Sequence, residues 1–204
     1  MVIGLLLNIS VMSSKKQILK EANHEPITTK GNVASLEGQV LGCDATAASN
    51  LSKDADAIIY IGGGEFHPLG IDSKKPILAI NPYANESYFI NENIEKKLKK
   101  QKGMLIAASQ AKTFGILLST KSGQFRLEQA KQIKQKLREL NKQAHILIAS
   151  EIDFNSLIDF NSFDAYITTA CPRLIDDSAR VEKPILNITQ FPQLTELIIA
   201  TKED

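Results

Sequence analysis

Short runs of apolar residues, separated by polar or glycine-rich stretches, recur along the whole chain. Each run has the length of a buried strand and is too short to span a membrane. The runs that predict strands are 3–9, 39–44, 56–61, 75–82, 114–120, 144–150, 163–169 and 183–188. Capping residues and helical spacing of apolar positions predict helices over 15–21, 45–51, 91–102 and 127–140. Strands that alternate with helices are typical of an α/β fold with parallel sheets.

The pattern of strands and helices occurs twice. Segment 56–78 resembles segment 164–186 at an offset of 108 residues, because both open with Asp-Ala and close with Lys-Pro-Ile-Leu. Segment 4–7 resembles segment 115–118 at an offset of 111. A repeat of this length indicates two related structural units. We therefore predict two homologous α/β domains, each a small parallel four-stranded sheet flanked by helices, over residues 1–109 and 110–204.

Composition excludes several classes of protein. The chain has 204 residues, 43% of them hydrophobic and 23% charged, with a formal net charge of +1. This is the balance of an ordinary globular protein, and it gives no electrostatic reason to expect a membrane or direct nucleic-acid partner. The apolar opening 1–7 is too short for a signal peptide or membrane span and lacks a basic flank, so it predicts a first strand. We expect a cytoplasmic protein, in which a disulfide between Cys43 and Cys171 would be unusual.

The candidate chemistry begins at Cys171, which ends an apolar strand in the sequence Thr-Thr-Ala-Cys-Pro-Arg. Pro172 has no N–H to donate and therefore ends the strand. In an open α/β sheet, ligands bind at the carboxyl ends of the strands, so Cys171 and Arg173 are candidate site residues. Two thiolates alone are too few to hold a metal or cluster, and two buried thiols remain the alternative for Cys43 and Cys171. Arg173 fits either a substrate carboxylate or a bridge between the two domains.

Three consecutive glycines, Gly62, Gly63 and Gly64, follow another predicted strand and precede His67. Glycines let a backbone approach a ligand closely and point N–H groups at it. The segment matches neither the dinucleotide-binding nor the P-loop motif, and a tight turn is the alternative. Gln39 and Glu151 also lie at predicted strand ends and are further candidates for the same cleft.

Four of these segments, in this order, resemble motifs of the archaeal diphthamide synthase family, the iron–sulfur 2-(3-amino-3-carboxypropyl)histidine synthases. They are Gln-Val-Leu-Gly-Cys-Asp at 39–44, Ile-Gly-Gly-Gly-Glu-Phe-His-Pro-Leu-Gly at 61–70, Ser-Glu-Ile at 150–152 and Thr-Ala-Cys-Pro-Arg-Leu at 169–174. The resemblance covers essentially the whole chain. By it, residues 1–109 match the family's middle domain and residues 110–204 its last domain.

The resemblance implies a fold, a cofactor and a reaction. In this family three homologous α/β domains each give one cysteine to a 4Fe-4S cluster, whose open iron binds S-adenosylmethionine. A 3-amino-3-carboxypropyl radical is then added to a histidine of translation elongation factor 2, the first step of diphthamide biosynthesis. By resemblance, Cys43 and Cys171 are cluster ligands. The residues Gly62, Gly63, Gly64, His67, Arg173, Gln39 and Glu151 are expected to bind the cofactors, and no residue is assigned a catalytic role.

One departure from the family sets the expected partners. Family members carry a further domain with a third cysteine, and this chain opens at what resembles the second domain. A truncated chain or a shortened, inactive relative is one explanation. We favour an enzyme whose first domain is a separate polypeptide, forming a homo- or heterodimer that modifies elongation factor 2. The alternatives are a non-catalytic subunit or scaffold without its own complete cluster, and a plain nucleotide-binding α/β protein that uses Gly62 to Gly64.

Overall fold

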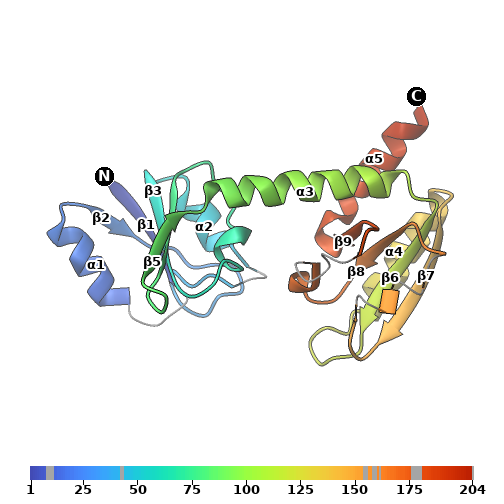
Figure 1. The fold of residues 1–204 in the computed structure, drawn as a ribbon, viewed down its shortest axis with the longest axis horizontal. Coiled ribbons are helices and arrows are strands. Elements are labelled where there is room, and N and C mark those ends of the chain that lie inside the picture. The colour runs from blue at the N-terminus through green and yellow to red at the C-terminus, as the bar shows by residue number, and fades with distance from the viewer. Residues whose placement is uncertain are drawn as a thin grey trace. The chain divides into compact units, whose positions relative to one another are not determined.

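The computed structural model describes residues 1–7, 12–41, 44–153, 156–157, 160, 162–175 and 181–203 (Figure 1). The chain forms two compact units, Met1–Leu98 and Lys99–Asp204, each with its own sheet. The division falls within helix α3 (Asn91–Ser109), earlier in the chain than the boundary at 109/110 expected from the sequence. Ile94 of this helix packs into the core of the first unit, and Leu105 packs into the core of the second.

The first unit contains a sheet in the order β2-β1-β3-β4-β5. Strands β1 to β4 run parallel, and β5 runs antiparallel to β4. Ala47 and Leu51 are fully buried in one cluster with Ile58 and Tyr60, so helix α2 covers this face of the sheet. The elements before α3 are β1 (Val2–Leu7), α1 (Met12–Glu21), β2 (Glu25–Ile27), α2 (Thr46–Leu51), β3 (Ala57–Ile61), the 3-10 helix η1 (Pro68–Gly70), β4 (Ile77–Asn81) and β5 (Glu86–Phe89).

The prediction of a strand over 39–44 is wrong. Leu41 and Asp44 form an isolated antiparallel bridge, and Gly42 and Cys43 between them lie outside the described residues. The parallel strand at this edge is instead β2, which contains Pro26 and pairs with β1 as the outermost strand of the described sheet. Three residues are too few to show an apolar pattern. The proline is tolerated because the strand is short and lies at the edge of the sheet.

The antiparallel strand β5 is a second difference from the predicted four-stranded sheet. The chain reverses after β4 because the side-chain Oδ1 of Asn81 accepts hydrogen bonds from the backbone N–H groups of Tyr83 (3.1 Å) and Ala84 (3.3 Å). Asn85 then adopts a left-handed conformation with φ 53°, which asparagine tolerates better than most residues. Most β5 side chains are exposed, so hydrophobic patterning does not reveal the strand.

The second unit contains four parallel strands in the order β7-β6-β8-β9. Helix α4 lies against β6 and β7 (Figure 1). Ala130, Ile133 and Leu137 of this helix are buried in the core, as their helical spacing predicts. The elements after α3 are β6 (Thr113–Ser119), α4 (Leu127–Glu139), β7 (Gln143–Ala149), β8 (Ala165–Thr168), the 3-10 helix η3 (Pro172–Ile175), β9 (Ile185–Asn187), the 3-10 helix η5 (Ile188–Gln190) and α5 (Phe191–Glu203). Within the described residues, no helix is both long enough and apolar enough to cross a bilayer.

Strand register confirms the internal repeat. In the first unit Gly4 pairs with Ile58, and in the second Gly115 pairs with Tyr166, at the offsets of 111 and 108 read from the sequence. The next ladder keeps the offset of 108, since Ile58 pairs with Ile77 and Tyr166 pairs with Ile185. Two α/β units with one shared strand order therefore make up the chain.

Equivalent carboxylates fasten the start of the third strand of each unit to its first strand. The backbone N–H of Val2 donates to Asp56 Oδ2 (2.7 Å), and that of Thr113 donates to Asp164 Oδ2 (2.9 Å). The hydroxyl of Thr113 also donates to Asp164, and these bonds lower the pKa of its carboxyl group. The Asp-Ala dipeptide that revealed the repeat thus has a structural role.

The edge strands β2 and β7 do not follow the same offset. Gly4 pairs with Ile27 and Gly115 pairs with His145, so these strands match at an offset of 118. At the offset of 108, counted back from the third strands, position 43 corresponds to position 151. Counted from the edge strands, at the offset of 118, these two positions do not correspond. Between the second and third strands, residues 28–56 in the first unit are replaced by the shorter segment 150–164 in the second.

Candidate metal and ligand site

Cys171 lies at the carboxyl edge of the second sheet, three residues after the end of β8 at Thr168. The backbone N–H and the hydroxyl of Thr169 both donate to the carbonyl oxygen of Leu117, at 3.0 and 3.1 Å. The backbone N–H of Ala170 donates to Thr168 Oγ1 (3.2 Å). Thr168, Thr169 and Ala170 are buried, whereas Cys171 is half-buried and its thiol is free. A rigid buried segment therefore delivers a partly accessible thiol to this edge.

Helix η3 begins directly after Cys171. The backbone N–H of Leu174 donates to the carbonyl oxygen of Cys171 (3.1 Å), so the chain turns sharply here. Arg173 lies in this turn, and its side chain is outside the described part of the structure. The predicted contact of Arg173 with a substrate carboxylate stays a prediction.

Glu151 follows β7 at the same edge of the sheet. Its carboxylate forms an ion pair with the ammonium group of Lys121, which follows β6, at 2.7 Å between Oε1 and Nζ. This hydrogen bond and the positive charge of Lys121 hold the pKa of Glu151 below its ordinary value. The side chains are 78% and 51% exposed, so the pair is open to solvent. Sequence reasoning identified Glu151 and missed Lys121, which is brought to it by the pairing of β6 with β7.

The glycines follow β3 at the carboxyl edge of the first sheet. Gly62 still belongs to the ladder, since its N–H donates to the carbonyl oxygen of Ile80 (3.0 Å). Gly64 has a φ of 69°, the left-handed conformation that glycine adopts without strain. His67 then precedes helix η1 and packs edge-on against the ring of Phe66, with ring centroids 5.2 Å apart. The predicted loop is therefore a tight turn that brings bare backbone to the strand end.

Cys43 lies outside the described residues, but the residues on either side of it are anchored. Leu41 and Asp44 exchange two backbone hydrogen bonds, at 3.0 and 3.1 Å. Gln39 Oε1 accepts hydrogen bonds from the backbone N–H groups of Ser35 (3.0 Å) and Leu36 (3.2 Å). The Gln39 side-chain oxygen thus holds a loop turn in place, and the predicted contact of Gln39 with a cofactor stays a prediction.

The buried carboxylate of Asp44 is the main anchor of this loop, and sequence reasoning missed it. Its Oδ2 accepts from the backbone N–H groups of Val33 (2.6 Å) and Ala34 (3.2 Å), and its Oδ1 accepts from the backbone N–H (3.0 Å) and hydroxyl of Thr46. The Thr46 hydroxyl is the largest cause, and with the backbone bonds it lowers the pKa of Asp44 to about 2. The only local signal is the Asp-Ala-Thr spacing before a helix, which is typical of an Asx turn.

Two further buried polar groups near the strand ends were also missed. Asn187 ends β9, and its side-chain Nδ2 is buried without a hydrogen-bond partner among the described residues. Tyr60 lies near the end of β3, and its hydroxyl is also buried without a hydrogen-bond partner among the described residues. Burial, together with the nearby Tyr88, raises the pKa of Tyr60 to about 12. Across the described part of the chain, no three histidine, cysteine, aspartate or glutamate residues converge as a metal-binding group.

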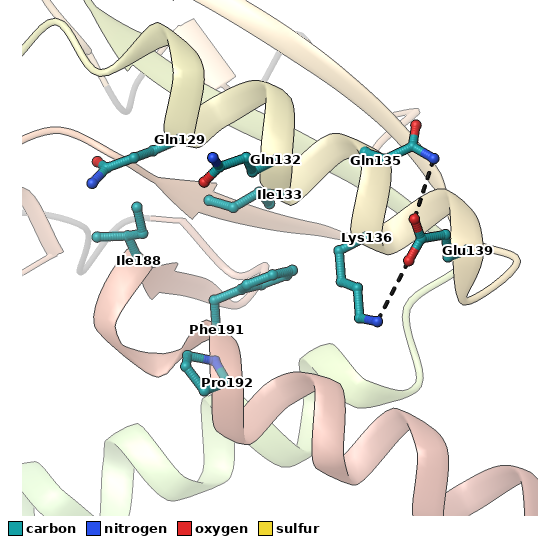
Figure 2. Close-up of a pocket in the computed structure, with 9 residues that line it drawn as sticks. All are labelled: Gln129, Gln132, Ile133, Gln135, Lys136, Glu139, Ile188, Phe191 and Pro192. Atoms are coloured by element: carbon teal, nitrogen blue, oxygen red, sulfur yellow. Dashed lines mark hydrogen bonds and ion pairs between the residues drawn. The ribbon is translucent and has the colours of Figure 1, made fainter.

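A surface groove in the second unit has a different lining from the predicted site. Figure 2 shows that helix α4 forms one wall and the start of α5 the other. The groove has a volume of about 560 Å³. The groove contains none of the residues that the sequence assigned to a cofactor. Its lining residues are Gln129, Gln132, Ile133, Gln135, Lys136, Glu139, Ile188, Phe191 and Pro192.

Comparison with known proteins gives one consistent result. A family described as "Putative diphthamide synthesis protein" matches residues 3–200. The chain is 32% identical to 2-(3-amino-3-carboxypropyl)histidine synthase of Pyrococcus horikoshii, over 97% of this chain and 56% of that relative. It is also 32% identical to the synthase subunit 1 of Yarrowia lipolytica, over 88% of this chain and 41% of that relative.

A solved structure supports the same relationship at the level of the fold. The crystal structure of Dph2 from Pyrococcus horikoshii with a 4Fe-4S cluster superposes with a TM-score of 0.80 at 31% identity. The match covers 96% of this chain and 57% of that one. This chain therefore spans little more than half the length of the archaeal protein that it matches.

Proposed function

Because the chain belongs to the diphthamide synthesis protein family, we propose that it is part of a 2-(3-amino-3-carboxypropyl)histidine synthase. The substrates in this proposal are S-adenosylmethionine and a histidine of translation elongation factor 2, and the group transferred is 3-amino-3-carboxypropyl. The observation that carries the proposal is the position of Cys171, a free, half-buried thiol at a rigid strand end within a chain that matches the family along nearly its whole length. A cytoplasmic location would keep its thiols reduced.

The residues at the carboxyl edges fit an iron–sulfur cluster in their chemistry. Thiolates are the usual cluster ligands, and N–H donors near the sulfurs tune the cluster's potential. Cys171 supplies a thiol, and Asn187, in the strand beside β8, has a buried N–H without a partner among the described residues. In the proposal Cys43 and Cys171 hold a 4Fe-4S cluster, which when bound supplies the electron that cleaves a carbon–sulfur bond of S-adenosylmethionine.

The remaining residues bind and orient the substrate. Gly63 and Gly64 bring backbone without side chains close to the amino-acid part or ribose of S-adenosylmethionine, with His67 beside them. Arg173, two residues after Cys171, pairs with the substrate carboxylate. Gln39 and Glu151 border the site, and Lys121 holds the Glu151 carboxylate in its ionised form.

Residues 1–204 hold two cysteines, and a cluster with one open iron needs three protein ligands, so the proposal includes a third cysteine outside these residues. We propose that a separate polypeptide supplies a first domain with the third cysteine, in a homo- or heterodimeric assembly. Relatives in Yarrowia lipolytica and Nematostella vectensis are named as subunit 1 of the synthase, which supports an enzyme of several subunits.

The same count of cysteines favours a second candidate function. A chain without a complete ligand set can serve as a non-catalytic subunit that holds elongation factor 2 or a catalytic partner. Calorimetric titration with S-adenosylmethionine distinguishes the two candidate functions. After reconstitution a subunit that carries the site releases or absorbs heat on binding, whereas a scaffold gives no binding heat.

The test of the leading proposal is anaerobic reconstitution with ferrous iron and sulfide, with and without a polypeptide that supplies the first domain. We expect visible cluster absorbance and bound iron that are most stable with that polypeptide. Cys43→Ser and Cys171→Ser should each abolish the stable cluster while the melting temperature of the iron-free protein is kept. If iron and sulfide content were unchanged in the double variant, the assignment of both ligands would be wrong.

A further inference from the structure

Asn187 lies in the last paired row of β8 and β9, near the carboxyl edge of the second sheet. It pairs with Thr168 of β8, and partners in a parallel ladder present their side chains to the same face. Thr168 Oγ1 accepts from the N–H of Ala170, the residue directly before Cys171. Helix η3, directly after Cys171, packs against β9. The segment that carries the thiol is thus held against the row that contains Asn187.

The orientation of the Asn187 amide is fixed by Thr189. Both the backbone N–H and the hydroxyl of Thr189 donate to Asn187 Oδ1, each at 3.0 Å. A backbone N–H can only donate, so this atom is the oxygen and the amide NH2 group is directed away from Thr189. Asn187 is 5% exposed, and its Nδ2 finds no acceptor among the described residues.

This buried donor is not needed for the cap that Asn187 provides. Its oxygen caps helix η5, and aspartate or serine would provide the same acceptor. Burying an amide N–H without a partner is unfavourable, so an unsatisfied buried donor in a native protein calls for an explanation, and a bound group that accepts the hydrogen bond is one.

The first unit has a buried donor in the equivalent row. Tyr60 and Ala79 pair in the register of Thr168 and Asn187, at the offset of 108. The hydroxyl of Tyr60 is fully buried and has no hydrogen-bond partner in the described part of the chain. In both units, therefore, this row contains a buried donor that has no acceptor among the residues that the structure describes.

We propose that the Asn187 side-chain N–H donates a hydrogen bond to a sulfur of the iron–sulfur group held by Cys171, and so raises the reduction potential of that group. Asn187 acts as a positioning residue that tunes its partner and does not touch the reacting atoms. This inference rests on the proposed function. Hydrogen bonds to cluster sulfurs favour the reduced, more negative state, which gives the direction of the effect.

The test compares variants that keep the cap and remove only the donor. Asn187→Ser introduces an uncharged side chain, and Asn187→Asp keeps the shape of the asparagine side chain. Both variants retain an oxygen that accepts from the Thr189 N–H. Thr189→Ala is the matched control, because it weakens the cap and leaves the amide in place. Each full-length protein is reconstituted anaerobically with ferrous iron and sulfide, with excess 2-mercaptoethanol as the source of the remaining thiolates. Iron content, melting temperature and midpoint potential are then measured.

We expect the midpoint potential to fall from wild type to Asn187→Ser and further to Asn187→Asp, whose charge adds to the loss of the donor. Thr189→Ala should lower the melting temperature and leave the potential unchanged. The iron-free Asn187→Ser variant should melt close to the wild-type temperature, because the cap is kept and no hydrogen bond of the amide N–H is lost. Iron-free Asn187→Asp should melt lower, because it buries a carboxylate at a position that is 5% exposed. Equal potentials in wild type and Asn187→Ser would overturn the inference alone. Failure of the wild-type chain to bind iron under all conditions would overturn both the inference and the proposed function.

Discussion

The two units share one strand order and one register, yet they place their cysteines in different connections. In the first unit Cys43 lies between the second and third strands, in segment 28–56. In the second unit the equivalent segment, 150–164, is shorter and carries Glu151 instead. Cys171 follows the third strand, where the first unit has Gly63. The sheet is the repeated part, and the positions of the cysteines vary around it.

The hydrogen bonds that hold the backbone beside each cysteine also differ between the two units. Thr168 and Thr169 hold the backbone next to Cys171 through neutral hydrogen bonds to the adjoining strand and turn. The chain beside Cys43 depends on Asp44, an ionised side chain that gathers three backbone N–H groups from two loops. The stability of the first unit should therefore fall more steeply at low pH than that of the second unit.

The largest difference should appear at the equivalent glycines of the first strands. A Cβ on Gly115 would lie 2.6 Å from a ring carbon of Tyr166, whereas a Cβ on Gly4 would lie 3.2 Å from the nearest atom of Leu51. The Tyr166 ring is fully buried, and its hydroxyl donates to the carbonyl oxygen of Phe160 (3.0 Å), so it has little room to move. We expect Gly115→Ala to lose about 3 kcal/mol of unfolding free energy and Gly4→Ala about 1 kcal/mol, measured by urea denaturation.

A double-mutant cycle identifies the cause of this loss. Tyr166→Leu removes the ring that the new methyl group meets, so Gly115→Ala should cost less in that background than in wild type. Equal losses for Gly4→Ala and Gly115→Ala would mean that the Tyr166 ring moves aside and that the two strands tolerate a methyl group equally well.

The next difference is in the pH dependence that Asp44 gives to the first unit. Its folded pKa of about 2 lies below the ordinary value of 3.8. The stabilisation is therefore complete above about pH 5 and is lost as the pH falls through 4 toward 2. We expect Asp44→Asn to lose about 1–2 kcal/mol at pH 7, and we expect the gap between variant and wild type to close near pH 2.

Asp164→Asn is the matched control in the second unit. Asp164 also accepts two backbone N–H groups and has a lowered pKa, but its side chain is exposed, so solvent weakens its contribution. The loss in Asp164→Asn should be smaller than in Asp44→Asn at pH 7. A gap for Asp44→Asn that stays constant from pH 7 to pH 2 would show that the charge of Asp44 has no part in the anchor.

The sequence predicted the elements whose own residues decide them. The apolar runs of β3, β6 and β8 and the spacing of Ala130, Ile133 and Leu137 needed no tertiary information. Strand β2 has three residues including a proline, and it exists because β1 offers a partner. Strand β5 is polar and follows from the turn at Asn81.

The residues of the candidate site also fall into those that the sequence alone predicts and those that depend on the fold. Cys171 was predictable because a Cys-Pro step must end a strand. The anchoring role of Asp44 was not, because its partners Val33 and Ala34 reach it only through the fold. The capping sequence Asn-Ile-Thr-Gln at 187–190 is readable, but the unpaired Nδ2 of Asn187 appears only once the strands are packed.

The smallest expected effect tests whether Gly63 and Cys171 are equivalent positions. A Cβ on Gly63 would make an ordinary contact with the Tyr83 ring at 3.5 Å, and its φ lies outside the left-handed region, unlike the φ of 69° at Gly64. Gly63→Ala should therefore be neutral or stabilise by about 0.5 kcal/mol, whereas Gly64→Ala should lose about 1 kcal/mol in the same urea measurement. If Gly63→Ala were the more costly of the two, the first unit would require a bare backbone at the position where the second carries its thiol.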